Sequence, residues 1–165
     1  LLEAMADTNV PLVMVGKALA EQEFDRTNPW NADRMKVHNL AQKNKNIHLL
    51  GFVSDEDLVR LYNSATAFIL PSLYEGFGLP ILEAMSCGTP VITTKCGSLP
   101  EVAGEAAYFV DAKDVISIAD GVRKLFGNKE IRDELSQKGL TQAKKFSWKK
   151  TAEETIQVYK KAIGS

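Results

Sequence analysis

Short apolar runs alternate along the chain with segments in which hydrophobic residues recur every three or four positions. Most of these runs do not alternate with polar residues, which is typical of parallel strands covered on both faces. Strands are therefore predicted over five runs: Leu12 to Val15, Ile47 to Leu50, Ala67 to Leu70, Val91 to Thr93 and Tyr108 to Val110. Strands separated by helices predict the α/β class, with a parallel sheet covered by helices.

The segments between these runs carry helix signals. Leu58, Leu61, Tyr62 and Ala65 share one face of a predicted helix. Asp55 and Glu56, after Ser54, resemble a helix start, because acidic groups are favoured near the positive end of the helix dipole. The last third of the chain shows no strand pattern. We expect three helices there, packed on the sheet.

The polar stretch from Glu21 to Asn31 has no hydrophobic periodicity. It is interpreted as an ordinary surface loop, with a mobile loop over the site as the alternative. Trp30 in this stretch and Trp148 near the C-terminus are predicted to be packing residues.

Composition excludes several classes of protein. The chain has 165 residues, 45% of them hydrophobic and 25% charged, which fits one soluble globular domain. A net charge of -1 gives no basic excess for binding nucleic acid, and no apolar run is long enough to span a bilayer. Cys87 and Cys96 are too few for a disulfide scaffold or a four-thiolate zinc site, and His38 and His48 lack metal-ligand spacing.

The stretch from Pro71 to Pro90 (PSLYEGFGLPILEAMSCGTP) carries the candidate chemistry. It follows a predicted strand, and ligands of open α/β sheets bind beyond the carboxyl ends of the strands. Gly76 and Gly78 leave the backbone thin, so that its N–H groups can approach a ligand. Pro80 suits the first position of a helix that stops at Gly88. A helix N-terminus beside a glycine loop predicts an anion site, and phosphate is the usual anion.

Two carboxylates flank this predicted anion site. Glu75 precedes the glycine loop, and Glu83 lies one helical turn inside. Because carboxylates accept hydrogen bonds and repel phosphates, their natural partners are hydroxyl groups. A nucleotide-sugar carries both phosphates and diols. The alternative is structural: Glu83 would complement the helix dipole, and Glu75 would be a solvated loop residue.

The segment from Tyr74 to Met85 resembles the E-x7-E signature of retaining GT-B glycosyltransferases. That group contains glycogen synthases, sucrose synthases and many bacterial mannosyl- and glucosyltransferases. Further segments follow in the family's order: Leu50 to Val53, Asp57-Leu58, Cys87 to Ile92, Gly97 to Val102, and Phe146 to Tyr159. The resemblance covers nearly the whole chain.

The resemblance implies one half of a GT-B fold, a Rossmann-like domain that binds the donor across a cleft from an N-terminal acceptor domain. Residues 1–165 are expected to be this single domain, lacking the acceptor domain and the domain's first strand. That strand belongs in the middle of the sheet order, so either another segment fills the gap or the domain is incomplete. The abrupt start at Leu1, without Met or a signal peptide, agrees with a fragment. The chain alone is therefore expected to show no turnover and at best weak nucleotide binding.

The resemblance also implies roles for the site residues. Glu75 contacts hydroxyl groups of the transferred sugar and is the candidate catalytic residue, and Glu83 accepts hydrogen bonds from the ribose. Phe77, Gly78 and Leu79 present backbone N–H groups to the sugar and the distal phosphate. Phe52 and Val53 border the base. Gly16, at the end of the strand Leu12 to Val15, lies on the same rim of the cleft as Phe52 and Val53.

No metal or cofactor is expected, because cationic side chains and the helix dipole hold the pyrophosphate in this family. The two family cations would precede Leu1 in the sequence. Lys17 and Lys95 could reach the cleft, but they are interpreted as solvated.

The implied reaction is hexosyl transfer from a nucleotide-diphosphate sugar with retention of configuration, by a front-face mechanism. The alternative mechanism is double displacement with Glu75 as the nucleophile. Two other functions stay open. One is a non-catalytic nucleotide-sugar-binding module, and the other is a phosphorylase, although no motif for a pyridoxal-phosphate lysine is apparent.

The expected partners are a nucleotide-sugar donor and the N-terminal domain, with no nucleic acid. Activated donors imply a cytoplasmic site. A basic patch of Lys144, Lys145, Lys149 and Lys150 is interpreted as solvated helix ends, with peripheral contact to anionic lipid head groups as the alternative. The sequence does not specify the base, the sugar or the acceptor.

Overall fold

The computed structural model describes residues 1–6, 8–20, 25 and 27–164. In chain order the elements are α1 (Leu2–Met5), β1 (Leu12–Val15), α2 (Lys17–Ala20), the 3-10 helix η1 (Pro29–Asn31), α3 (Ala32–Lys43), β2 (Ile47–Leu50), α4 (Asp55–Ser64), β3 (Phe68–Leu70), α5 (Leu79–Ser86), β4 (Val91–Thr94), α6 (Leu99–Ala103), β5 (Ala107–Val110), α7 (Val115–Gly127), α8 (Lys129–Ala143) and α9 (Trp148–Ala162).

All five predicted strands are present, and each bound agrees with the prediction to within one residue. Every strand pair is parallel, with β1 beside β2 and with β4 between β3 and β5. Within the described residues the strands form two sheets, which we call the first sheet (β1-β2) and the second sheet (β3-β4-β5). The α/β class with helix-covered parallel strands is confirmed. The strands do not join into one continuous sheet, because no described strand pairs with the free edge of β1 or of β3.

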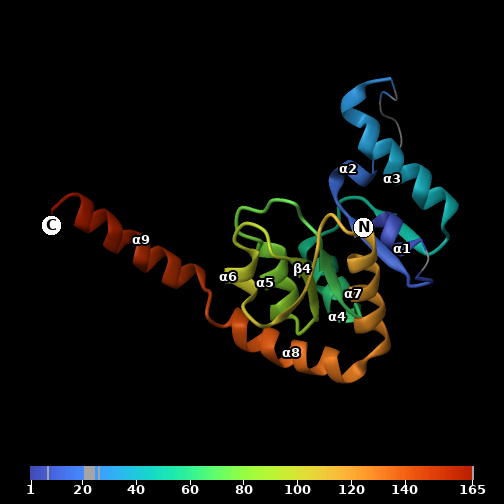
Figure 1. The fold of residues 1–165 in the computed structure, drawn as a ribbon. Coiled ribbons are helices and arrows are strands. Elements are labelled where there is room, and N and C mark those ends of the chain that lie inside the picture. Colours follow the sequence, from blue (N-terminus) through green and yellow to red (C-terminus); the bar gives the residue numbers. More distant parts are fainter. Residues whose placement is uncertain (7, 21–24, 26, 165) are drawn as a thin grey trace.

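The core consists of two hydrophobic clusters. One takes residues from both sheets, such as Leu12 of β1 and Ile92 of β4, and packs them against α1, α7 and α8. The other joins Val91 of β4 to α5 and α6, and includes Tyr62 of α4. The second sheet is therefore covered on both faces. Figure 1 shows β4 in the middle of the molecule, with α5 and α6 to one side of it and α7 to the other.

The first sheet is covered on one face only. Its residues Val13 and Val15 are 44% and 40% exposed, whereas all four residues of β4 are buried. The prediction that the strands are covered on both faces is therefore confirmed for β4 and wrong for β1 and β2. The physical reason is that the cluster around α5 and α6 contains no described residue of the first sheet.

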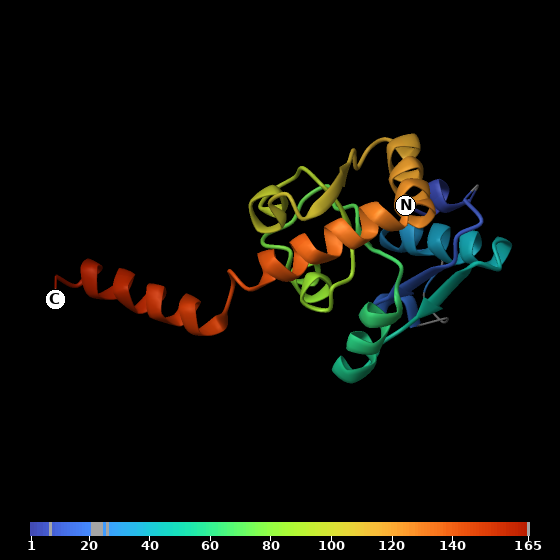
Figure 2. The same ribbon diagram turned by 90° about the horizontal axis from the view of Figure 1, so that it is seen from below.

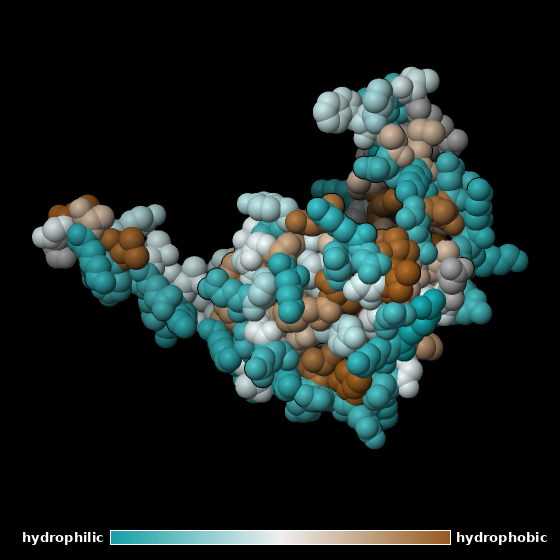
Figure 3. Space-filling view, viewed as in Figure 1, coloured by the Kyte–Doolittle hydropathy of each residue, from teal (hydrophilic) through white to brown (hydrophobic). Residues whose placement is uncertain are grey.

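The helix α9 projects away from the rest of the molecule, as two perpendicular views show (Figures 1 and 2). None of its described residues is buried. Ile156 and Tyr159 of α9 and the following Ile163 are exposed apolar residues. Figure 3 shows hydrophobic surface on the arm at its left. The prediction of three helices packed on the sheet is right for α7 and α8, which contact β5, and wrong for α9. Ser147 caps α9, and its side chain accepts a hydrogen bond from the Lys150 N–H.

Much of the stretch predicted as a loop, Glu21 to Asn31, lies outside the described residues, which here comprise 25 and 27–31. Its end forms η1, in which the Asn28 side chain accepts a hydrogen bond from the Trp30 N–H. Trp30 is 94% exposed and Trp148 is 76% exposed. The prediction that these two tryptophans are packing residues is therefore wrong.

Candidate functional site

The glycine loop between β3 and α5 has the backbone geometry that the sequence predicts. Gly78, the residue before α5, has a φ of 93°, in the left-handed region that favours glycine. A Cβ at this position would also lie 2.6 Å from Cδ2 of Leu99. Pro80 occupies the second helical position rather than the predicted first, because the helix already begins at Leu79. The helix ends at Ser86, just before Gly88, as expected.

Backbone donors collect at the start of this helix. The N–H groups of Phe77, Gly78 and Leu79 form no hydrogen bond with any residue that the structure describes. The N-terminus of a helix carries partial positive charge from its peptide dipoles. The loop therefore offers three consecutive donors to an anionic or oxygen-rich ligand.

The segment that leads into α6 holds the glycine loop in place. The Ser98 hydroxyl donates to the carbonyl oxygen of Phe77 at 2.9 Å. Gly97 packs so closely on the loop that a Cβ there would collide with the carbonyl oxygen of Glu75. On the other side, the Phe77 ring meets the ring of Phe146 edge to face at 6.0 Å. The shape of the loop is thus fixed by contacts outside it.

Glu75, the candidate catalytic residue, is half-buried and held by the end of β4. Its Oε2 accepts a hydrogen bond from the Ser72 hydroxyl at 3.2 Å. The Ser72 carbonyl in turn accepts from Oγ1 of Thr94 at 2.7 Å and from Sγ of Cys96 at 2.9 Å. Because Thr94 is buried in β4, this relay connects the carboxylate to the centre of the second sheet.

Glu83 is exposed on α5 and has one buried partner. The Tyr62 hydroxyl, from α4, donates to its Oε2 at 3.1 Å. Burial, together with the negative charge of Glu83 and the hydrogen bond to it, raises the pKa of Tyr62. The phenol donates one hydrogen bond, and the carboxylate has further acceptor positions that this bond does not use.

The residues predicted to border the base lie on the first sheet. The Gly16 N–H, at the end of β1, donates to the carbonyl oxygens of Leu50 and Gly51, which lie at the end of β2. Phe52 is 72% exposed, and Nζ of Lys17 lies 5.4 Å from the centre of its ring. Gly16 and Phe52 thus lie at the same edge of the first sheet. Val53, next in the chain, leads into the helix α4.

The structure therefore brings the predicted residues together in two groups. One group is Gly16, Phe52 and Val53 on the first sheet; the other extends from Glu75 to Glu83 on the second. Within the described chain, no hydrogen bond, ion pair or ring contact joins the first group to the second. The helix α4 begins shortly after Val53 and carries Tyr62, the hydrogen-bond partner of Glu83, so it is the element that connects the two groups.

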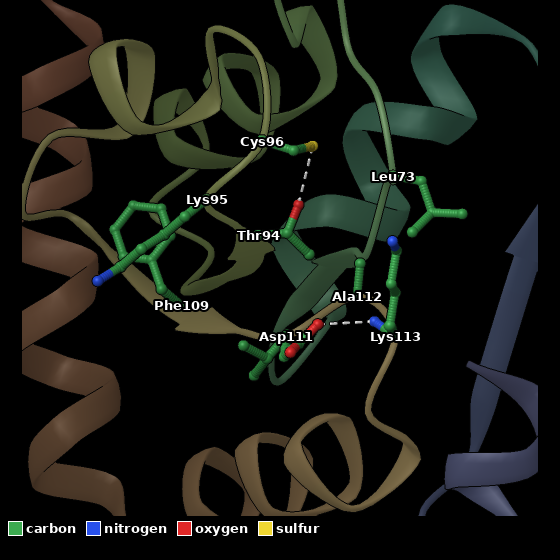
Figure 4. Close-up of a pocket in the computed structure, with 9 residues that line it drawn as sticks. Leu73, Thr94, Lys95, Cys96, Phe109, Asp111, Ala112 and Lys113 are labelled. Atoms are coloured by element: carbon green, nitrogen blue, oxygen red, sulfur yellow. Dashed lines mark hydrogen bonds between the residues drawn. The ribbon is translucent and has the colours of Figure 1, made fainter.

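A cavity of about 470 Å³ opens at the carboxyl ends of β4 and β5 (Figure 4). Thr94 and Cys96, which hold Ser72, line it, and so does Leu73 of the loop before Glu75. Lys95 and Lys113 also line the cavity, but Nζ of Lys95 lies over the Phe109 ring at 5.8 Å. This cavity adjoins the glycine loop and is lined by neither Glu75 nor Glu83.

Other expectations concern metals and membranes. Among the described residues, no group of His, Cys, Asp and Glu could hold a metal ion, and no helix is both long and apolar enough to cross a membrane. In the basic patch, Lys149 and Lys150 each lie 4.0 Å from a glutamate one turn further along α9. The absence of a cofactor and the cytoplasmic location remain predictions.

Sequence analysis misses the residues that position the two carboxylates: Tyr62, Ser72, Thr94 and Ser98. The hydrophobic pattern assigns Tyr62 to an apolar helix face, where its ring indeed lies, but it does not indicate a partner for the hydroxyl. The two threonines of the otherwise apolar strand β4 could have indicated these contacts. Buried hydroxyl groups require hydrogen-bond partners, so threonines in a buried strand predict bonds to a neighbouring segment. Thr93 and Thr94 both donate to carbonyl oxygens of the neighbouring chain segment.

Comparison with known proteins adds a family and a fold. Residues 1–142 match the family described as Glycosyl transferases group 1. The O-antigen chain mannosyltransferase B of Escherichia coli is 48% identical over 114 residues, which cover 69% of this chain and 30% of that protein. The MMP alpha-(1->4)-mannosyltransferase of Mycolicibacterium hassiacum is 40% identical over 121 residues, which cover 71% of this chain and 29% of that protein.

Solved structures with the same fold extend the comparison. Sucrose-phosphate synthase from Thermosynechococcus elongatus matches with a TM-score of 0.82 and 26% identity, over 99% of this chain and 41% of that chain. The Anabaena HepE protein, in complex with UDP-glucose, matches with a TM-score of 0.71 and 19% identity, over 87% of this chain and 38% of that chain. The chain spans 30% of the first of these mannosyltransferases and 29% of the second.

Proposed function

The chain belongs to the glycosyl transferases group 1 family, and from that premise we propose that it takes part in hexosyl transfer from a nucleoside-diphosphate sugar, with retention of configuration. Curated relatives named mannosyltransferases favour mannose as the transferred sugar. The HepE structure with UDP-glucose supports a nucleotide-sugar as the donor class.

One observation carries the proposal. The backbone N–H groups of Phe77, Gly78 and Leu79, which have no partner among the described residues, lie between the carboxylates of Glu75 and Glu83 in the sequence. Donors at a helix N-terminus suit a diphosphate, and carboxylates suit the hydroxyl groups of a sugar and a ribose. A nucleoside-diphosphate sugar has these groups in the order that the loop requires.

In the proposed reaction, the bond between the anomeric carbon and the distal phosphate oxygen breaks. Positive charge develops on the sugar ring and negative charge on the leaving diphosphate. The N–H groups of the glycine loop stabilise that negative charge, and removing one such donor from an enzyme raises the barrier by roughly 3–4 kcal/mol. The acceptor hydroxyl attacks on the face from which the diphosphate departs, and a diphosphate oxygen takes its proton.

Glu75 holds hydroxyl groups of the transferred sugar in this proposal and forms no covalent bond. The diphosphate is already a good leaving group, so the reaction does not require the strong acid that glycosidases use. Glu83 accepts hydrogen bonds from the ribose hydroxyls, and Phe52 and Val53 border the base, with Gly16 on the same rim. No metal or cofactor is part of the proposal.

We assign the chain to the donor-binding part of a longer enzyme, because it spans less than a third of the mannosyltransferases compared above. The acceptor then contacts a part of the protein outside this chain. By itself the chain is expected to show no transfer and at best weak nucleotide binding. Micromolar donor affinity in a calorimetric titration, together with turnover by the isolated chain, would contradict this expectation.

The proposal is tested in the full-length protein by first selecting the donor with a thermal-shift panel of UDP-, GDP- and ADP-sugars. Glu83→Ala is expected to weaken donor binding about tenfold or more, because a charged acceptor is lost. Glu75→Ala is expected to lower turnover about a hundredfold or more while donor binding stays within about tenfold. Glu130→Ala, an exposed glutamate on α8, serves as the control and should change neither quantity.

The two substitutions separate the proposed enzyme from a non-catalytic binding module. If donor binding is unchanged in Glu83→Ala, the site is wrongly placed. If the wild-type protein binds a nucleotide-sugar and transfers no sugar to any acceptor, the binding module is the correct function. A covalent glycosyl adduct on Glu75 would replace the front-face mechanism with double displacement.

A further inference from the structure

We propose that Tyr62 is a positioning residue that orients the Glu83 carboxylate toward the ribose of the donor and thereby sets the preference of the site for a ribose diol. This inference rests on the proposed function. The observation behind it is the hydrogen bond of 3.1 Å from the Tyr62 hydroxyl to Oε2 of Glu83. It joins α4 to α5 across 21 residues of sequence.

Tyr62 is itself held in a single place. Its side chain is 7% exposed, and its ring packs edge to face on Phe68 with the ring centres 5.3 Å apart. Its carbonyl oxygen accepts a hydrogen bond of 2.7 Å from the buried Thr89 hydroxyl. Because the Tyr62 backbone is held by Thr89 and its ring by Phe68, the hydroxyl is presented at a defined point beside α5.

Glu83 differs from Tyr62 because its side chain is exposed. A long, solvent-exposed carboxylate on a helix samples many rotamers, and binding a ligand in one of them costs conformational entropy. The hydroxyl from the buried ring selects the rotamers in which Oε2 lies over α4. The carboxylate is then oriented before the donor arrives, which improves binding without a new contact to the donor.

The hydroxyl also leaves Glu83 able to bind a diol. Each carboxylate oxygen accepts about two hydrogen bonds. Tyr62 uses one acceptor position on Oε2, and Oε1 has no partner among the described residues. The Tyr62 hydroxyl acts as the donor in this pair and leaves acceptor positions on the Glu83 carboxylate. Two neighbouring ribose hydroxyls can then donate to one carboxylate.

The test measures transfer by the full-length protein with two donors. One is the UDP-, GDP- or ADP-sugar selected by the thermal-shift panel, and the other is its analogue lacking the ribose 2′-hydroxyl. In the wild-type protein the missing hydroxyl should raise KM about tenfold. In Tyr62→Phe, KM for the ordinary donor should rise about fivefold, kcat should stay within about twofold, and the penalty for the deoxy donor should shrink to about twofold.

Two further variants complete the design. Glu83→Gln should also remove the deoxy penalty, and the double variant should behave like Glu83→Gln alone, because both residues act on the same hydroxyl. Tyr108→Phe, on β5, removes a phenol hydroxyl that bonds to no described residue, and should leave both donors unaffected. Tyr62→Phe retains the aromatic ring and its contact with Phe68, so the thermal unfolding midpoint should equal that of the wild-type protein.

The outcomes are distinguishable. If Glu83→Gln removes the deoxy penalty and Tyr62→Phe keeps it, Tyr62 does not position the carboxylate and the proposed function stands. The same conclusion follows if Tyr62→Phe lowers thermal stability and kcat together while the penalty is unchanged, since that is a structural effect. If the wild-type protein shows no penalty, or Glu83→Gln retains it, Glu83 does not bind the ribose, and both this inference and the ribose role proposed for Glu83 fail. The proposed transfer reaction fails separately, if the wild-type protein transfers no sugar from the ordinary donor.

Discussion

The two sheets of the molecule differ in how they are covered and in how firmly they hold their part of the site. Hydrophobic clusters lie on both faces of the second sheet, and all four residues of β4 are buried. The first sheet is covered on one face, and Val13 and Val15 face outward on the other. Both sheets are parallel and both end at candidate site residues, so the difference lies in their surroundings.

The hydrogen bonds follow the same division. In the second sheet, buried hydroxyls of Thr93 and Thr94 donate to the end of β3 and the chain that follows it, and the relay reaches Glu75 through Ser72. In the first sheet, Gly16 is held by backbone hydrogen bonds alone. The comparison teaches that this chain fixes the residues proposed for the sugar, the diphosphate and the ribose more firmly than those proposed for the base.

The largest effect is expected from displacing the glycine loop from the segment before α6 that supports it. Gly97→Ala places a methyl group against the carbonyl oxygen of Glu75, at a φ of 51°. The loop must shift, and a displacement of about 1 Å is expected to lower kcat/KM about a hundredfold in the full-length protein. The measurement is steady-state transfer with the donor selected as above.

Gly127→Ala is the matched control, since a Cβ there meets no atom within 4 Å. It adds the same methyl group at the end of α7 and should leave kcat/KM unchanged. Retention of most of the activity in Gly97→Ala would show that the support from the α6 side is not required.

A smaller effect is expected from removing one buried hydroxyl. Thr94→Val keeps the shape of the side chain and leaves the Ser72 carbonyl with Cys96 as its remaining described partner. The loss should destabilise the protein by about 1–3 kcal/mol. Differential scanning calorimetry would detect this as a lower unfolding midpoint.

The corresponding substitution in the first sheet is expected to change stability less. Val13→Thr exchanges the same two side-chain types on an exposed face of β1, where the free energy of unfolding should change by less than about 0.5 kcal/mol. Equal shifts in the unfolding midpoint for the two variants would contradict the difference between the sheets.

The smallest effect is expected at the exposed ring of the first sheet. Phe52→Leu removes the aromatic face over which Lys17 lies. Stability should be unchanged because the ring is exposed, and KM for the donor should rise about threefold. Isothermal titration with the donor provides an independent check. A loss as large as that of Gly97→Ala would mean that the first sheet contributes equally to the site.

The sequence predicts well what depends on neighbouring residues. The bounds of β1 follow from an apolar run between Pro11 and Gly16. The helix α5 begins one residue before the predicted Pro80 and ends at Ser86, before Gly88, as predicted. Glu75, Gly78 and Glu83 could be proposed as site residues because the signature is contiguous.

What the sequence does not predict depends on elements far apart in the chain. Nothing local to Val13 indicates whether a helix covers it. The partner of Glu83 lies 21 residues away, and the apolar stripe that contains Tyr62 indicates burial of the ring but not the direction of its hydroxyl. The amphipathic pattern of α9 likewise indicates a face that requires cover without specifying what covers it.

The unpaired strand edges have a consequence for handling the protein. Among the described residues each sheet has two outer strands, β1 and β2 in the first and β3 and β5 in the second, and the outer backbone N–H and C=O groups of these strands pair with no described strand. Such rows act as templates for strands of other chains, and a net charge of -1 provides little mutual repulsion. Strand addition at such an edge joins one copy of the chain to another, so we expect any association of this polypeptide to increase with its concentration.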